Sequence, residues 1–167
     1  MQGMQLSRAA DQLAIQRGAN FFTNYCSGCH SLRYMRSQSN HLTTISMPET
    51  DATQWFGRMP PDLSLTARER GPAWVYSYLT SFYADPTRPF GANNRLIPDV
   101  AMPNVLAPLK DQNQLKADLH DVVSFLDYVA EPTRLIRYRT GAMVMVFLAI
   151  LGWLIYRLKS LYWRDIS

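Results

Sequence analysis

Cysteine is scarce in this sequence, and so are charged residues. The 167 residues include two cysteines, Cys26 and Cys29, and charged side chains make up 18% of the chain. Two cysteines cannot build the disulfide-dense scaffold of a small secreted protein. Hydrophobic residues reach 47% and aromatic residues 12%, which is too apolar for an intrinsically disordered chain. The sequence therefore predicts one folded domain of ordinary size with a short appendage.

Acidic residues are nearly missing from the last fifth of the chain. The net charge of +4 at first favours nucleic-acid binding. Residues 1–133 carry eleven Lys or Arg and twelve Asp or Glu, a sum of −1, whereas residues 134–167 carry six and one, a sum of +5. Nucleic-acid binders spread their basic residues over a folded face. Here they bracket an apolar segment, so we expect no nucleic-acid partner.

The apolar segment is residues 140–156, seventeen residues without a charge. As a helix it would be about 26 Å long, near the lower limit for crossing a hydrocarbon core of roughly 30 Å. Trp153, Tyr156, Tyr162 and Trp163 supply an aromatic belt at its C-terminal end. The alternative is a buried core helix, but such helices are seldom apolar on every face. The sequence predicts a single C-terminal membrane span.

The orientation of this span does not follow from charge, because three basic residues lie on each side of it. Residues 1–22 contain no continuous apolar stretch of the kind that a signal peptide needs. We therefore expect either that a signal peptide has been removed or that export uses another route.

The most informative motif is Cys26-Ser27-Gly28-Cys29-His30. The pattern C-x-x-C-H is the attachment signature of c-type haem: two thiols one helical turn apart can form thioethers to the vinyl groups, and the following histidine can bind the iron. A zinc site would need two further ligands, and His41 and His120 have irregular spacing. A thioredoxin-like redox pair would need a βαβ context. The motif predicts one covalent haem c.

The sequence predicts two helices in the haem domain, one immediately before the motif and one shortly before the span. The first leads into the motif and contains Gly18, a poor helix former that suits a close crossing with another helix. The second begins near Asn113 and ends at Glu131-Pro132. Its apolar residues repeat at spacings of four and three: Leu115, Leu119, Val122, Leu126 and Val129. The prediction is a mainly α, cytochrome c-like haem domain with one C-terminal transmembrane helix.

Met102 is the strongest candidate for a second iron ligand. It lies in an extended loop between Pro98 and Pro103, where the prolines limit backbone freedom and can hold a thioether toward the iron. Met59, before Pro60-Pro61, is the rival. A haem with two protein ligands transfers electrons, whereas an open site binds or activates small molecules.

Several segments together are similar to one known family. They are Asn24–Arg33, Met59–Ser64, Ala67–Gly71, Ser81–Phe90, Val100–Pro103 and Phe125–Pro132, followed by the span. In this order they resemble cytochrome c1 of the proteobacterial type, the haem subunit of the ubiquinol–cytochrome c oxidoreductase (bc1) complex.

The resemblance implies a role for individual residues. Cys26 and Cys29 would form the thioethers, and His30 and Met102 would be the proximal and distal iron ligands. Pro60 and Pro61 would line the haem near His30. Arg70 would pair with a haem propionate, and Trp74 would lie near the haem.

The resemblance also implies a function without catalysis by the subunit alone. The chain would accept one electron from the Rieske iron–sulfur protein and pass it to cytochrome c, beside cytochrome b in the inner membrane. Haem attachment occurs outside the cytoplasm, so residues 1–133 would be periplasmic, and residues 134–167 would form the anchor with a short cytoplasmic tail. The alternative functions are a freestanding anchored cytochrome or haem enzyme with an open sixth site and, less favoured, a structural zinc module.

Overall fold

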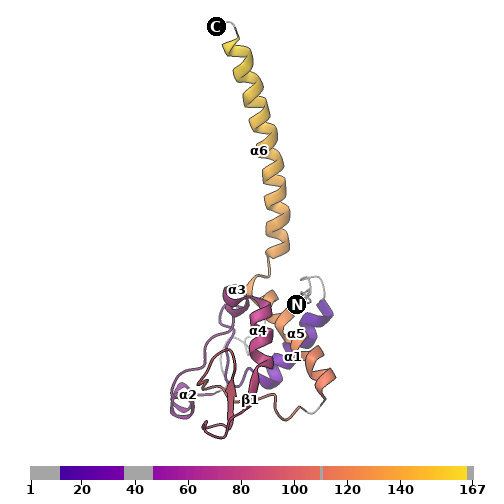
Figure 1. The fold of residues 1–167 in the computed structure, drawn as a ribbon. Coiled ribbons are helices and arrows are strands. Elements are labelled where there is room, and N and C mark those ends of the chain that lie inside the picture. Colours follow the sequence, from indigo (N-terminus) through magenta and orange to yellow (C-terminus); the bar gives the residue numbers. More distant parts are fainter. Residues whose placement is uncertain (1–11, 36–46, 110, 165–167) are drawn as a thin grey trace. The chain divides into compact units, whose positions relative to one another are not determined.

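The computed structural model describes residues 12–35, 47–109 and 111–164, which form helices and one small sheet (Figure 1). The elements in chain order are α1 (Gln12–Tyr25), α2 (Glu49–Phe56), α3 (Thr66–Arg70), α4 (Pro72–Thr80), β1 (Phe82–Ala84), β2 (Ala92–Asn94), α5 (Gln112–Ala130) and α6 (Arg134–Trp163). The chain divides into two compact units, Met1–Glu131 and Pro132–Ser167. The predicted mainly α fold is confirmed.

The core of the first unit is the crossing of α1 and α5. Gly18 is buried on α1, and a Cβ atom at this position would lie 2.1 Å from the backbone oxygen of Asp121 on α5. The missing side chain therefore lets the two backbones touch. Beside this contact, the rings of Phe22 and Phe125 meet at a centroid distance of 5.8 Å. The close crossing that Gly18 predicted is confirmed.

Helix α5 has the features that its sequence predicts. The Asp111 carboxylate accepts hydrogen bonds from the backbone N–H groups of Asn113 and Gln114, at 3.0 and 3.1 Å, and so caps the helix. Its apolar repeat faces the core: Leu119, Val122, Leu126 and Val129 are buried, and Leu115 packs against them. The helix ends immediately before Glu131-Pro132.

Short helices and strands between α1 and α5 make up the rest of the first unit. Gly71, with φ of 91°, separates α3 from α4, and Pro72 occupies the first turn of α4. Strands β1 and β2 pair antiparallel with Phe82 opposite Asn94. The buried side chain of Asn93 accepts a hydrogen bond from Asp99 N–H at 3.0 Å. This bond ties the hairpin to the loop that follows it.

The second unit is the long helix α6. By length and composition, Ile136–Trp163 could cross a membrane, with a mean hydropathy of 2.0 in its most apolar window. This range contains the predicted span 140–156. Two guanidinium groups lie over aromatic rings of α6: Arg137 over Tyr138, at 5.3 Å, and Arg157 over Trp153, at 5.7 Å. Such pairs allow basic side chains to lie along an apolar helix near the membrane surface.

Candidate cofactor site

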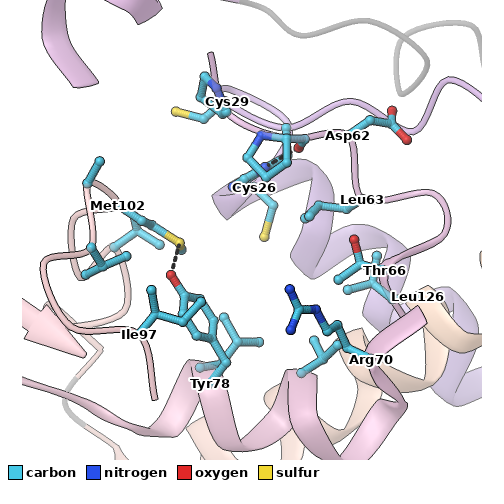
Figure 2. Close-up of a pocket in the computed structure, with 18 of the residues that line it drawn as sticks. Cys26, Cys29, Asp62, Leu63, Thr66, Arg70, Tyr78, Ile97, Met102 and Leu126 are labelled. Carbon is cyan, nitrogen blue, oxygen red and sulfur yellow. Dashed lines mark hydrogen bonds between the residues drawn. The ribbon is translucent and has the colours of Figure 1, made fainter. Parts of the chain in front are cut away.

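A cavity of about 420 Å³ lies within the first unit (Figure 2). Its volume is in the range of small-molecule and cofactor pockets. All eight residues that the sequence suggested for cofactor binding line it: Cys26, Cys29, His30, Pro60, Pro61, Arg70, Trp74 and Met102. They come from the turn after α1, the loop before α3, the end of α3, the start of α4 and the loop after β2. The fold therefore brings residues as distant in sequence as Cys26 and Met102, 76 positions apart, to the wall of one cavity.

The two cysteines lie on a tight turn that continues α1. The backbone N–H groups of Cys29 and His30 both donate to the carbonyl oxygen of Cys26, at 3.0 and 2.8 Å. Both cysteines are free thiols. Burial, together with the nearby Cys29, raises the pKa of Cys26 to about 12, and burial raises the pKa of Cys29 as well. The turn thus presents two neutral thiols at the cavity.

His30 is oriented by the loop that carries the two prolines. Its Nδ1 lies 2.8 Å from the carbonyl oxygen of Pro61. Because a carbonyl can only accept, Nδ1 carries the proton and Nε2 keeps its lone pair. Burial lowers the pKa of His30, an effect that the Pro61 carbonyl and Asp62 only partly oppose. A neutral imidazole with a fixed tautomer is the form that binds a metal ion.

Asp62 joins the same loop to the residues after His30. Its carboxylate accepts hydrogen bonds from the Ser31 hydroxyl at 2.7 Å, Arg33 N–H at 2.8 Å and Ser64 N–H at 2.9 Å. Partial burial raises its pKa, but these hydrogen bonds outweigh burial and the pKa lies below its ordinary value. In Figure 2 this carboxylate points away from the cavity. Asp62 thus stabilises the backbone that follows His30, and its carboxylate does not itself point into the cavity.

Met102 forms part of a different wall, supplied by the loop after β2. Its Sδ lies 3.7 Å from the hydroxyl of Tyr78, which donates to it. Met59, the rival candidate, also lines the cavity. His120 is on α5 and is not among the described residues that line the cavity. His41 lies outside the described residues.

Arg70 points into the cavity (Figure 2). Its guanidinium lies over the ring of Trp74, 5.1 Å from the centroid. Arg58 also lines the cavity, although the sequence did not single it out. Two guanidinium groups beside an otherwise largely apolar wall suit a ligand that is apolar over most of its surface and carries anionic groups. Arg68 is exposed and is not among the described lining residues.

Sequence reasoning also missed several aromatic residues of the wall, namely Tyr25, Phe56 and Tyr78. One signal could have found Tyr78. It lies four residues after Trp74, a spacing that places two side chains on the same face of a helix. The two rings are stacked, with centroids 5.3 Å apart and planes 11° apart.

The donor set at this cavity fits an iron porphyrin better than a bare metal ion. No group of three or more His, Cys, Asp or Glu side chains suited to a metal ion occurs within residues 12–35, 47–109 and 111–164. The cavity instead brings together two thiols from one turn, one imidazole and a thioether, the groups that attach and bind haem in cytochromes c.

The sequence matches the Cytochrome C1 family over residues 3–56 and 47–166. The chain belongs to the cytochrome c1 family. It is 37% identical to cytochrome c1 of Allochromatium vinosum, over 93% of this chain and 86% of that protein. It is also 33% identical to a protein of Nitrosomonas europaea named ammonia monooxygenase gamma subunit, over 94% and 85% of the two chains.

A solved structure supports the same fold. A chain of a hyperthermophilic respiratory complex III matches with a TM-score of 0.60 at 19% identity, over 92% of this chain and 77% of that chain. As a cytochrome c1, the chain is a membrane-anchored, electron-transfer haem subunit of a respiratory complex III and is not catalytic on its own. The family cofactor is haem c, and the resemblance to proteobacterial cytochrome c1 is confirmed.

Proposed function

We propose that the cavity holds one haem c, attached through thioethers to Cys26 and Cys29, with His30 and Met102 as the axial ligands. The observation that carries this proposal is the arrangement of the cavity wall, on which both thiols, the Nδ1-protonated imidazole and the thioether lie together. Haem c, when bound, supplies one iron centre that alternates between Fe(II) and Fe(III).

The residues of the chain have separate tasks at this site. The Pro61 carbonyl fixes the tautomer of His30, so that Nε2 is the nitrogen offered to the iron. Apolar side chains such as Phe22, Val122 and Leu126 exclude water from the cavity. A dry cavity favours Fe(II), for which the iron–porphyrin core is neutral, over Fe(III), for which the core carries a positive charge. Arg70, with Arg58 as a second candidate, pairs with the haem propionates.

We propose the finer function from membership of the cytochrome c1 family together with this site. The subunit accepts one electron from the Rieske iron–sulfur protein, passes it to cytochrome c, and assembles with cytochrome b. Residues 1–133 form the periplasmic haem domain and residues 134–167 anchor it in the inner membrane, with a short cytoplasmic tail. The sum of −1 over residues 1–133 becomes about −3 with two ionised propionates, which suits a basic cytochrome c partner.

The ligand assignment is tested by comparing Met102→Ala with Met59→Ala in the full-length protein. We expect the oxidised wild type to show the weak methionine–Fe(III) charge-transfer band, and we expect Met102→Ala to abolish it while Met59→Ala keeps it. The reverse pattern would make Met59 the ligand. If both variants keep the band, another methionine is the ligand. Absence of the band from the wild type would favour an anchored haem protein with an open sixth site.

Covalent attachment and assembly need separate measurements. Haem should stay with the wild-type polypeptide after denaturation and should be lost from a Cys26→Ala/Cys29→Ala variant. A colourless purified protein would contradict haem binding and favour a zinc module. Co-purification with a cytochrome b and a Rieske subunit would support the role in the complex, and purification as a freestanding cytochrome would argue against it.

A further inference from the structure

Tyr78 contacts Met102 in a way that the ligand assignment does not require. Tyr78 is on α4, and its hydroxyl lies 3.7 Å from Met102 Sδ (Figure 2). This distance is within the longer range of hydrogen bonds to sulfur, in which the hydroxyl donates and the thioether accepts weakly. Both residues line the cavity. The polar atom of the tyrosine is therefore directed at the sulfur that the proposed function assigns to the iron.

The ring of Tyr78 is held in place on two sides. It stacks on Trp74, with centroids 5.3 Å apart, and meets the edge of Phe82 at 5.4 Å with an interplanar angle of 73°. Each aromatic pair of this kind stabilises the ring position beyond the effect of burial alone. The hydroxyl is consequently positioned by packing before it meets Met102, and its hydrogen bond costs little further ordering.

A buried asparagine ties the backbone of the same helix to the loop that leads to Met102. Asn94 is 1% exposed, and its Nδ2 donates to the carbonyl oxygen of Tyr78 at 2.8 Å. Its Oδ1 accepts from the N–H of Leu96 at 2.9 Å. Helix α4 and the residues before Met102 are thus joined twice, by the Asn94 amide and by the Tyr78 hydroxyl.

We propose that Tyr78 is a positioning residue for Met102: its hydroxyl holds the thioether in one orientation and reduces the electron density that Sδ offers to the haem iron. This inference rests on the proposed function, in which Met102 is the distal ligand. A thioether sulfur has two lone pairs, so it can bind iron with one and accept a hydrogen bond with the other. Hydrogen bonds to ligand atoms are among the features that set haem reduction potentials.

The sign of the effect follows from donor strength. A sulfur whose second lone pair accepts a hydrogen bond from a hydroxyl donates less electron density to the iron. Electron density from a ligand stabilises Fe(III) more than Fe(II). The hydrogen bond therefore favours reduced haem and raises the reduction potential. Its removal should lower the potential and raise the ratio of oxidised to reduced haem at a fixed potential about threefold, the effect of a weak hydrogen bond.

The test compares Tyr78→Phe with Tyr76→Phe in the full-length protein. Tyr76 is on the same helix and packs against the hydrophobic core, so the same substitution there controls for the loss of a hydroxyl from α4. Phenylalanine at position 78 keeps the ring that stacks on Trp74. We expect Tyr78→Phe to lower the midpoint potential in a redox titration and to shift the methionine–Fe(III) band, and we expect Tyr76→Phe to do neither.

Two results would overturn the inference: a potential and band for Tyr78→Phe equal to those of Tyr76→Phe, or a potential that rises. The outcome for Met102→Ala separates this failure from failure of the proposed function. If Met102→Ala loses the band while Tyr78→Phe matches its control, only the role of Tyr78 is wrong. If Met102→Ala keeps the band, the ligand assignment is wrong and the role of Tyr78 is wrong with it.

Discussion

The contact between α1 and α5 at Gly18 gives a sharp test of the fold. In a Gly18→Ala variant, the new Cβ would lie 2.1 Å from the backbone oxygen of Asp121, 2.6 Å from its carbonyl carbon and 2.8 Å from the Cβ of Phe125. Real Cβ contacts are essentially never closer than 3.0 Å, so α1 and α5 must separate by about 0.9 Å at this point. Two of the three clashing atoms are backbone, and no side-chain rotation can relieve the contact.

Two opposite effects decide the size of the change in unfolding free energy. Alanine is favoured over glycine inside a helix by about 1 kcal/mol. Overpacking a well-packed core costs about 1–3 kcal/mol, and occasionally more. The upper part of this range applies, because separating the helices also loosens the contact between Phe22 and Phe125. We therefore expect Gly18→Ala to destabilise the protein by about 2 kcal/mol despite its better helix propensity.

Urea unfolding of the full-length protein in detergent, followed by circular dichroism, measures this difference. Asn20→Ala is the matched control, since Asn20 is exposed on the same helix and the substitution changes helix propensity without a clash. We expect Asn20→Ala to be neutral or stabilising by a few tenths of a kcal/mol. If Gly18→Ala is as stable as the wild type, the backbones of α1 and α5 do not touch at Gly18 and the reasoning is refuted.

Two further predictions concern polar contacts. The pKa of Asp62 is lowered in the folded state, so its ionised carboxylate stabilises the fold above about pH 4, and this stability is lost as pH falls through the folded pKa. Asp62→Asn should lower the unfolding free energy by about 1–2 kcal/mol at pH 7 and flatten its dependence on acid pH. An acid dependence equal to that of the wild type would contradict the role of Asp62. The Arg17 guanidinium donates two hydrogen bonds to the carboxylate of the nearly buried Asp121, at 2.5 and 3.1 Å. A double-mutant cycle of unfolding free energies with Arg17→Met and Asp121→Asn should give a coupling of about 1 kcal/mol. A coupling near zero would show that the pair does not support the helix crossing.

The sequence was sufficient for features that depend on local pattern. The apolar repeat of residues 115–129 predicted the buried face of α5, and the charge-free segment 140–156 predicted a helix long enough to cross a membrane. Gly18 predicted a close helix crossing, because glycine weakens a helix and suits a position where a neighbouring backbone leaves no room for a side chain. Each feature has a local signal in the sequence (a repeat, an apolar run or a single glycine), although the Gly18 crossing itself joins two helices that are distant in sequence.

Side-chain contacts between distant segments that leave no such local signal could not be predicted in this way. The bond from His30 to Pro61 joins residues 31 positions apart, and the bond from Tyr78 to Met102 joins residues 24 apart. No periodicity marks such pairs. The hairpin was missed for a similar reason, since its strands are only three residues long. It is held by side-chain bonds of Asn93 to Asp85 and to Asp99 rather than by an apolar alternation.

The supports of the two proposed axial ligands differ in kind. On the His30 side, the ligand follows Cys29 directly in sequence, so covalent attachment of haem to that turn would fix the histidine near the iron, and the Pro61 carbonyl has only to fix the tautomer. Met102 lies on a separate loop and would have no covalent link to the porphyrin. Its position depends on the Tyr78 hydroxyl and on the Asn94 amide. Substitutions on the Met102 wall should therefore change the reduction potential more than equally conservative ones on the His30 wall, because only the former alter a ligand that non-covalent contacts alone hold in place.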